Sequence, residues 1–410
     1  AIVGGGWAGL AAAVAATQRG HRVDLFEAAR FLGGRARTLE VRMPDGATVA
    51  LDNGQHILIG AYVQTLRLME AVGVDLGAAL LRLPLVLRDA QGQGIALPHW
   101  PAPLDAMAGI LGARGWSWSD KLSLLRSSLR WQATGFRCAP ECTVADLCRG
   151  LRPRVREQLI EPLCVAALNT PAARASGQVF LRVLKDSLFG RGHGRYGGSN
   201  LLLPRQDLGR VFPHAAQGWL QQHGAQVQLG ERLDSLVPLQ QQGFDEIILA
   251  VPALEAARLV ESGGVAAPAW CAQARALCYE AIATTYVTGG PRLPFPMLAL
   301  AGGPAQFVFD RGQLGGPAGL LAFVASASPA GREEVERQVL AQAAALGWPV
   351  QALQTVVEKR ATFACTPGLQ RPPMHIAPHL WACGDYVDGP YPATLEGAVR
   401  AGLAVVSAFR

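Results

Sequence analysis

A glycine-rich run at the start of the chain has the residue types and the spacing that hold a dinucleotide. Gly4, Gly6 and Gly9 fit the pattern G-x-G-x-x-G, with Trp7 and Ala8 between the last two glycines. Such a turn lets backbone N–H groups approach a pyrophosphate, and the N-terminus of a following helix favours the phosphate charge. The alternative interpretation is an ordinary glycine turn between a strand and a helix.

The surrounding elements favour the dinucleotide. An apolar run over 1–3 precedes the glycines, a helix is predicted over 10–19, and an alternating strand over 21–26 leads to Glu27 and Ala28. The carboxylate at the end of this second strand can accept hydrogen bonds from ribose hydroxyls. These residues predict a βαβ unit that binds either NAD or FAD.

A second glycine motif follows the βαβ unit. Gly33 and Gly34 permit close backbone approach, and Arg35 offers a fork of donors to an anion. This segment resembles the Gly-Gly-Arg motif of the flavin amine oxidase and carotenoid desaturase superfamily. In that superfamily the segment runs beside the FAD pyrophosphate and the arginine reaches phosphate, so the resemblance implies FAD as the cofactor.

The end of the chain resembles the C-terminal FAD motif of the same superfamily. The resemblance implies that Asp385 binds the ribityl or phosphate region and that a helix starting near Thr394 begins beneath the isoalloxazine. A helix N-terminus there would stabilise the negative charge of reduced flavin. It also implies that strands near 224–229 and 244–252 complete the domain near the adenine, with Val227 in the strand region. The C-terminal residues expected at the cofactor are Gly384, Asp385, Thr394, Leu395, Glu396 and Ala398.

The order of these motifs predicts an α/β fold with two interleaved domains. A Rossmann-like FAD-binding domain of the glutathione-reductase and amine-oxidase type is expected from 1–80, 205–265 and 366–410. An α+β substrate domain is expected from 81–204 and 266–365. The chain shows neither an internal repeat nor a low-complexity linker, which suits interleaved domains.

Four segments carry a narrower resemblance. Residues 52–62, 168–176, 203–208 and 392–398 are similar to the squalene-associated FAD enzymes, the bacterial hydroxysqualene dehydroxylases. The resemblance implies a step of squalene and hopanoid biosynthesis in which hydroxysqualene loses its allylic hydroxyl, gains a hydride and becomes squalene. A carotenoid or phytoene-type desaturase and a flavin amine oxidase are the alternatives within the fold. An FAD-binding terpenoid carrier, or a scaffold for upstream squalene-pathway enzymes, is the alternative without catalysis.

Four side chains are candidates for the chemistry. A leaving hydroxyl needs a proton, which His56 or an Asp52 of raised pKa can supply. Gln55 can hydrogen-bond the flavin or the substrate hydroxyl, and Tyr391 can reach the flavin face. The structural alternatives are turn capping for Asp52, a structural hydrogen bond for His56 and packing for Tyr391. The neighbouring residues expected to contact the cofactor are Asn53, Gly54 and Gln55.

Composition narrows the class of protein. Half of the 410 residues are hydrophobic and 17% are charged, which excludes a disordered chain. The net charge of +6 comes without a Lys/Arg tract, so we expect no nucleic-acid partner. The eight cysteines form no C-x-x-C pair and no zinc spacing, so we expect reduced thiols and no metal site. The sequence shows no signal peptide, and because it begins at Ala1 inside a strand, we expect further residues before it.

The segment 100–131 suggests a membrane surface. It holds Trp100, Trp116, Trp118 and Trp131, four of the nine tryptophans, among leucines and basic residues. Interfacial tryptophans beside basic side chains are typical of helices that lie on a membrane, whereas the alternative is a helix packed on its own core. No apolar run is long enough to span a bilayer. An insoluble C30 isoprenoid substrate predicts a cytoplasmic enzyme on the inner face of the bacterial cytoplasmic membrane.

Overall fold

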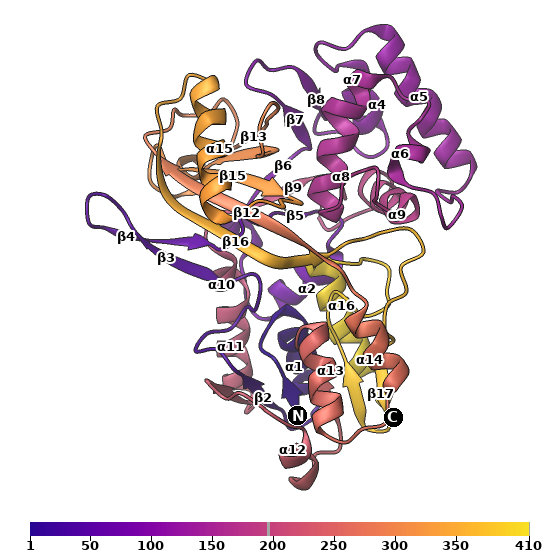
Figure 1. Ribbon diagram of the computed structural model, residues 1–410, viewed down its shortest axis with the longest axis vertical. Coiled ribbons are helices and arrows are strands. Elements are labelled where there is room, and N and C mark those ends of the chain that lie inside the picture. The colour runs from indigo at the N-terminus through magenta and orange to yellow at the C-terminus, as the bar shows by residue number, and fades with distance from the viewer. Residues whose placement is uncertain (195–196, 410) are drawn as a thin grey trace.

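Three widely separated segments of the chain meet in one six-stranded sheet of the computed structural model, which describes residues 1–194 and 197–409 (Figure 1). Neighbouring strands run parallel except at one edge, where β17 is antiparallel to β18. This order is that of a doubly wound nucleotide-binding sheet. Across the sheet the strands are β10 (Gln226–Leu229), β2 (Asp24–Glu27), β1 (Ile2–Val3), β11 (Ile247–Leu249), β18 (Leu380–Ala382) and β17 (His375–Ala377).

Helices cover both faces of this sheet. Because side chains alternate along a strand, Ile2, Leu25 and Ile248 pack into one apolar layer while their chain neighbours pack into the other. The first layer contains side chains of α1 (Trp7–Gln18), α2 (Val63–Ala71), α10 (Leu208–Val211), α11 (Pro213–Gln222) and α16 (Leu395–Ser407). The second contains side chains of α12 (Val237–Gln241), α13 (Ala253–Ser262) and α14 (Pro268–Arg275).

A second, antiparallel sheet crosses the middle of the molecule (Figure 1). One of its faces is covered by α15 (Arg332–Ala345), with Val335 and Val339 packed in the same cluster as Phe323. The other face presents Phe307 and Phe309 toward the main core. In order, the strands are β13 (Met297–Ala299), β14 (Phe307–Asp310), β15 (Leu321–Ser326), β12 (Tyr279–Thr288) and β16 (Gln351–Phe363).

Helices gather at the end of the molecule away from the two termini (Figure 1). They are α4 (Leu104–Leu111), α5 (Trp118–Ala133), α6 (Val144–Leu147), α7 (Pro153–Val155), the π-helical turn Arg156–Ile160, α8 (Glu161–Leu168) and α9 (Gly177–Leu188). Short strands join this group to the rest: β5 (Leu58–Ile59), β9 (Leu201–Pro204) and β6 (Leu80–Leu83) form one sheet, and β7 (Val86–Arg88) pairs with β8 (Gly94–Ala96). The remaining elements are the hairpin of β3 (Thr38–Arg42) and β4 (Thr48–Asp52), α3 (Leu76–Ala79) and a 3₁₀ turn, Arg311–Leu314.

The α/β class and the Rossmann-like unit predicted from the sequence are present. The first helix begins at Trp7, three residues before the predicted start, because Gly6 already has the extended backbone of an N-cap. All eight cysteines are free thiols. Within residues 1–194 and 197–409, no helix has both the length and the apolar character needed to cross a membrane.

A buried carboxylate fixes α16 at its first turn. The Glu396 side chain is fully buried and accepts hydrogen bonds from the backbone N–H groups of Gln64 (3.1 Å) and Thr65 (2.9 Å) and from the Thr65 hydroxyl (2.8 Å). Arg400 Nε donates to the same carboxylate at 2.7 Å. Glu396, expected at the cofactor, therefore joins α16 to the start of α2 instead.

Replacing this carboxylate should destabilise the fold. Glu396→Ala leaves two backbone N–H groups without an acceptor and Arg400 without its partner, so we expect a loss of about 3 kcal/mol in the free energy of unfolding. Glu40→Ala, at an exposed position of β3, should change it by less than about 0.5 kcal/mol. Urea unfolding measures both, and equal losses would contradict the role given to Glu396.

Candidate cofactor and substrate site

Two positions of the turn after β1 accept only glycine. Gly4 has φ +110°, and a Cβ on it would lie 2.5 Å from the carbonyl oxygen of Ala250. A Cβ on Gly9 would lie 1.9 Å from the carbonyl oxygen of Gly4. The first turn of α1 therefore packs directly on the loop, which only residues without a side chain allow.

Gly6 leaves open space instead of filling a close contact. A Cβ there would meet only the Gly34 Cα, at 3.9 Å. Gly6 is the N-cap of α1, and no side chain caps this helix. Its first N–H groups and its partial positive charge are thus suited to a diphosphate.

Glu27 fixes the shape of the glycine turn. Its two carboxylate oxygens accept hydrogen bonds from the backbone N–H groups of Gly5 (2.6 Å) and Ala29 (2.8 Å). Each oxygen has a further lone pair, so the same carboxylate is able to accept a ribose hydroxyl. Glu27 is both a structural residue of the loop and a wall of the cavity beside it.

Arg35 and Asp385 join the second glycine motif to the C-terminal motif across 350 residues of sequence. Arg35 Nη2 lies 2.5 Å from Asp385 Oδ1, and its Nη1 donates to the carbonyl of Ala361 at 2.8 Å. Burial opposes the charged guanidinium, but the Asp385 carboxylate outweighs burial and raises the pKa of Arg35. The cavity wall thus carries a cation that is paired with Asp385. The partner expected from the sequence was a phosphate of the cofactor.

A cavity of about 620 Å³, the dinucleotide cavity, lies at the carboxyl ends of the parallel strands. Trp7 Nε1 and Tyr386 OH are buried in its walls and have no hydrogen-bond partner among the residues that the structure describes, which fits a polar ligand. The expected residues that line the cavity are Gly4, Gly6, Trp7, Ala8, Glu27, Ala28, Gly33, Gly34, Arg35, Asn53, Gly54, Gln55, His56, Gly384, Asp385, Thr394, Leu395 and Ala398.

Some expected residues lie elsewhere. Val227 is in the middle of β10, and the wall is formed instead by Glu231, Arg232 and Leu233 after the end of that strand. The residues that follow β11, 250–252, also line the cavity, at the end of the segment 244–252 that was expected near the adenine. The sequence signal was available, since ligands of such sheets bind beyond the strand ends and not along the strands. Gly9, Asp52, Glu396 and Tyr391 do not line this cavity either.

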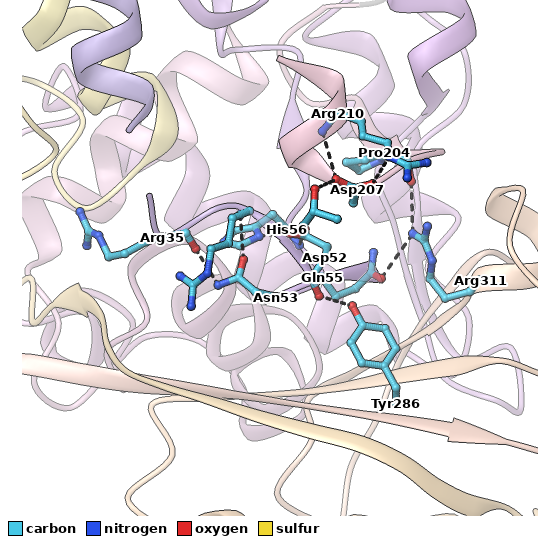
Figure 2. A network of polar contacts seen from close by, with 12 residues as sticks. Arg35, Asp52, Asn53, Gln55, His56, Pro204, Asp207, Arg210, Tyr286 and Arg311 are labelled. Atoms are coloured by element: carbon cyan, nitrogen blue, oxygen red, sulfur yellow. Dashed lines mark hydrogen bonds and ion pairs between the residues drawn. The ribbon is translucent and has the colours of Figure 1, made fainter. Parts of the chain in front are cut away.

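The turn after β4 is held by a small polar network (Figure 2). Asp52 is buried, and its Oδ2 accepts from the His56 backbone N–H at 2.8 Å and lies 2.9 Å from His56 Nδ1. The Tyr286 hydroxyl donates to the Asp52 carbonyl at 2.5 Å. The antiparallel sheet therefore fixes the backbone on which His56 sits.

Two further side chains extend the network (Figure 2). Asn53 accepts from the Arg37 backbone N–H at 3.0 Å and donates to the Arg35 carbonyl at 2.9 Å. Gln55 has a left-handed backbone, φ +45°, and its Oε1 accepts from Arg311 Nη1 at 3.4 Å. Arg311 is buried although it is an arginine, and neither it nor Tyr286 was predicted, because they approach from distant segments of the chain.

His56 is held ready to carry a proton. Burial opposes its charged form, but the charge of Asp52 and the hydrogen bond to it outweigh burial and raise the pKa above the ordinary 6.5. The side chain is 28% exposed and lines the dinucleotide cavity. Because Nδ1 is bound to Asp52, Nε2 is the ring position from which His56 can give a proton to a ligand.

A second cavity, of about 390 Å³, adjoins the first and is called the apolar cavity here. Aliphatic and aromatic side chains make most of its wall, among them Leu97, Ile110, Leu124, Leu159, Phe180 and Met297. The residues that line both cavities are Ile57, Tyr62, Ala166, Ala167, Phe307, Phe309 and Thr394. A ligand in the apolar cavity is therefore able to contact one in the dinucleotide cavity.

Tyr391 lies on the apolar cavity. Its hydroxyl donates to Asp186 Oδ2 at 2.6 Å, and Arg182 Nε donates to the same oxygen at 2.7 Å. Burial and the hydrogen bond to Asp186 raise the pKa of Tyr391 to about 12. The phenol therefore stays neutral and is a weak acid near neutral pH.

Comparison with known proteins agrees with this architecture. The family of NAD(P)-binding Rossmann-like domains matches residues 2–72. A hydroxysqualene dehydroxylase from Rhodopseudomonas palustris is 26% identical over 98% of this chain and 96% of that protein. A carotenoid phi-ring synthase from Streptomyces griseus is 43% identical over 84 residues, which make up 20% of this chain and 16% of that protein.

Solved structures share the fold over nearly the whole chain. An oxidoreductase from Methanosarcina mazei has a TM-score of 0.75 at 15% identity and covers 99% of both chains. A reduced UDP-galactopyranose mutase has a TM-score of 0.68 at 15% identity and covers 99% of this chain and 92% of its own. At this identity the likeness shows a common fold.

The space beside Gly6 gives a test of the dinucleotide cavity. Gly6→Ala should fold normally, because no protein atom lies within 3.4 Å of the added Cβ, but the methyl group should hinder the pyrophosphate. We expect at least a tenfold loss of dinucleotide affinity, about 1.4 kcal/mol. The measurement is cofactor content by absorbance after release. Gly218→Ala, a helical position with open space around it, is the matched control; equal content in both variants would refute the assignment.

The His56–Asp52 pair predicts a pH dependence. Since the folded pKa of His56 is raised, the pair stabilises the fold fully below pH 6.5, and this contribution is lost as the pH rises through the folded pKa. A proton NMR titration of the His56 ring should give a pKa above 6.5. Asp52→Asn should lower it, because burial then acts unopposed, whereas Asp45→Asn in the exposed hairpin turn should not. An unchanged pKa in Asp52→Asn would show that the carboxylate is not the cause.

Proposed function

We propose that this protein is an FAD-dependent oxidoreductase that converts hydroxysqualene to squalene by reductive dehydroxylation. The observation that carries the proposal is an apolar cavity that shares a wall with a dinucleotide cavity. An allylic alcohol of thirty carbons is almost entirely hydrocarbon and needs such a wall. The similarity to hydroxysqualene dehydroxylases along nearly the full chain supports the same substrate.

The dinucleotide cavity has the groups that FAD requires. The uncapped start of α1 suits the pyrophosphate, Glu27 suits the ribose, and Arg35 provides a fixed positive charge. The unpartnered Trp7 Nε1 and Tyr386 OH suit further polar atoms of the cofactor. Reduced FAD, when bound, supplies the hydride that replaces the hydroxyl group.

The chain itself must supply one proton. When the allylic C–O bond breaks, its electron pair leaves on oxygen, and protonation makes the leaving group water. His56 suits this task because its pKa is raised and its Nε2 is the position able to donate. Asp52 orients the ring and stabilises its charged form. Tyr391 is the weaker acid, since its pKa is about 12.

The apolar wall protects the intermediate. Loss of water leaves an allylic cation on the substrate, which solvent would capture and return to the alcohol. Phe307 and Phe309 stand where the two cavities meet, and Ile57 continues that wall. Excluding water there lets the carbon gain a hydride instead of a hydroxyl.

The decisive experiment is turnover by the purified protein. Anaerobically reduced enzyme with hydroxysqualene should yield squalene, detected by gas chromatography. His56→Ala should lower the rate by about 10²- to 10⁴-fold, the usual contribution of a general acid, and Asp52→Asn should lower it as well. His214→Ala, at an exposed position, should leave it unchanged.

Other outcomes would decide for other functions. Desaturated products under oxidising conditions, without squalene, would indicate a carotenoid-type desaturase, for which the apolar cavity is equally suited. Reduction of the flavin by amines with release of peroxide would indicate an amine oxidase. Bound flavin and terpenoid without turnover would indicate a carrier. Undiminished turnover in both His56→Ala and Asp52→Asn would remove these residues from the mechanism.

A further inference from the structure

Exposed apolar side chains concentrate on two neighbouring helices. The part of the chain that the structure describes exposes ten large hydrophobic residues, and seven of them belong to the segment of α4 and α5. A water-soluble surface rarely gathers apolar side chains in this way without a partner. The seven are Trp100, Leu104, Met107, Leu111, Trp118, Leu122 and Leu129.

Helix α5 carries apolar side chains on two opposite faces. Trp118, Leu122 and Leu129 are spaced by four and seven residues, so they project on one side of the helix. Leu124 and Trp131 lie on the other side and are buried. The buried face accounts for the packing of α5 on the core, whereas Trp118, Leu122 and Leu129 on the outward face are exposed.

Some of the exposed apolar side chains also line the apolar cavity. Met107 and Leu129 are exposed and also line the cavity, as does the exposed Phe189 at the end of α9. Phe189 packs on Phe136, another cavity residue, with ring centroids 5.3 Å apart. An apolar path therefore leads from this surface to the interior.

The charged side chains of residues 100–137 that are not buried are all basic. Asp105 and Asp120 are buried, and they hydrogen-bond to Ser199 and Ser117 respectively. The basic residues between positions 100 and 137 are Arg114, Lys121, Arg126, Arg130 and Arg137. Lys121 Nζ lies 5.2 Å from the Trp118 ring centre, which places an ammonium beside the most exposed tryptophan.

We propose that this lipid-facing surface, residues 100–131 together with Phe189, docks on an anionic bilayer so that the apolar cavity opens into hydrocarbon. Apolar side chains flanked by basic ones suit the boundary between acyl chains and acidic headgroups. A second copy of the chain fits less well, because a two-fold contact would set the same basic residues against one another. The inference rests on exposure and charge and does not depend on the proposed reaction.

The structure also divides the four tryptophans of this segment. Trp100 and Trp118 are 55% and 69% exposed. Trp116 and Trp131 are buried, and Trp116 Nε1 donates to Gln158 at 2.8 Å. The expectation of four interfacial tryptophans is therefore wrong for two of them, which are core residues.

Vesicle co-sedimentation of the whole protein tests the proposal. Wild type should bind vesicles containing phosphatidylglycerol, more weakly at high salt, and bind phosphatidylcholine vesicles less. Trp118→Ser/Leu122→Ser/Leu129→Ser should lose at least tenfold in partitioning. Lys121→Gln, Arg126→Gln and Arg130→Gln should each cost about fivefold on the anionic vesicles only. Val237→Ser, an exposed apolar position on α12, should bind as wild type.

Fluorescence identifies the residues that enter the lipid. Vesicles with brominated acyl chains should quench wild-type tryptophan emission, and Trp100→Phe/Trp118→Phe should lose this quenching while Trp219→Phe on α11 keeps it. Thermal unfolding and cofactor content confirm that each variant is folded. The proposal would be overturned if the wild type did not bind anionic vesicles or if the triple variant bound them as well as the wild type does. It would also be overturned if the wild type were a dimer and the triple variant a monomer. None of these measurements requires turnover, so they stand apart from the test of the reaction.

Discussion

One guanidinium connects the parts of this protein that must meet for a site to exist. Arg35 follows the second glycine motif, pairs with Asp385 from the end of the chain, and donates to the Ala361 carbonyl on a strand of the antiparallel sheet. Because one half-buried guanidinium makes both the ion pair and the carbonyl contact, these two bonds hold the three segments together. The dinucleotide cavity is enclosed by the same segments. Its geometry thus depends on a contact between residues 350 positions apart.

The sequence predicted what local rules control. The glycine spacing located the first turn because Gly4 and Gly9 have no room for a side chain, and this requirement is visible in the residue types themselves. Val227 lies in the expected strand, whereas the cavity is lined by the residues that follow the end of that strand. The contacts of Glu396 could not be read from the sequence, because a carboxylate at a helix start suits a ligand or a neighbouring helix equally and only the tertiary fold brings Thr65 to it.

The hydrogen-bond network around His56 could be predicted only in part. Asp52 and His56 are four residues apart, and their pairing could be anticipated from that spacing. Tyr286, which fixes the backbone, comes from a strand of the antiparallel sheet, and Arg311, which contacts Gln55, comes from the 3₁₀ turn after β14. They are buried polar groups whose partners lie hundreds of residues away. Nothing in their local sequence distinguishes them from ordinary strand and turn residues, so long-range hydrogen bonding has to be observed.

Amphipathic patterning reaches its limit in α5. When a helix is apolar on one face only, its sequence predicts which face is buried. Helix α5 has leucine and tryptophan on both faces, so its sequence does not distinguish the buried face from the exposed one. The two faces differ in the position of the carboxylates. Asp120 completes the capping box of Ser117 on the buried side by accepting from the Ser117 backbone N–H, which leaves basic residues as the charges around the outward face. Exposed apolar area alone would suit many partners, whereas the removal of negative charge from the same area selects an anionic one. The apolar residues of this chain therefore have three roles, in the core, in the cavity wall and on the outer surface. The positions of the charged residues distinguish these roles.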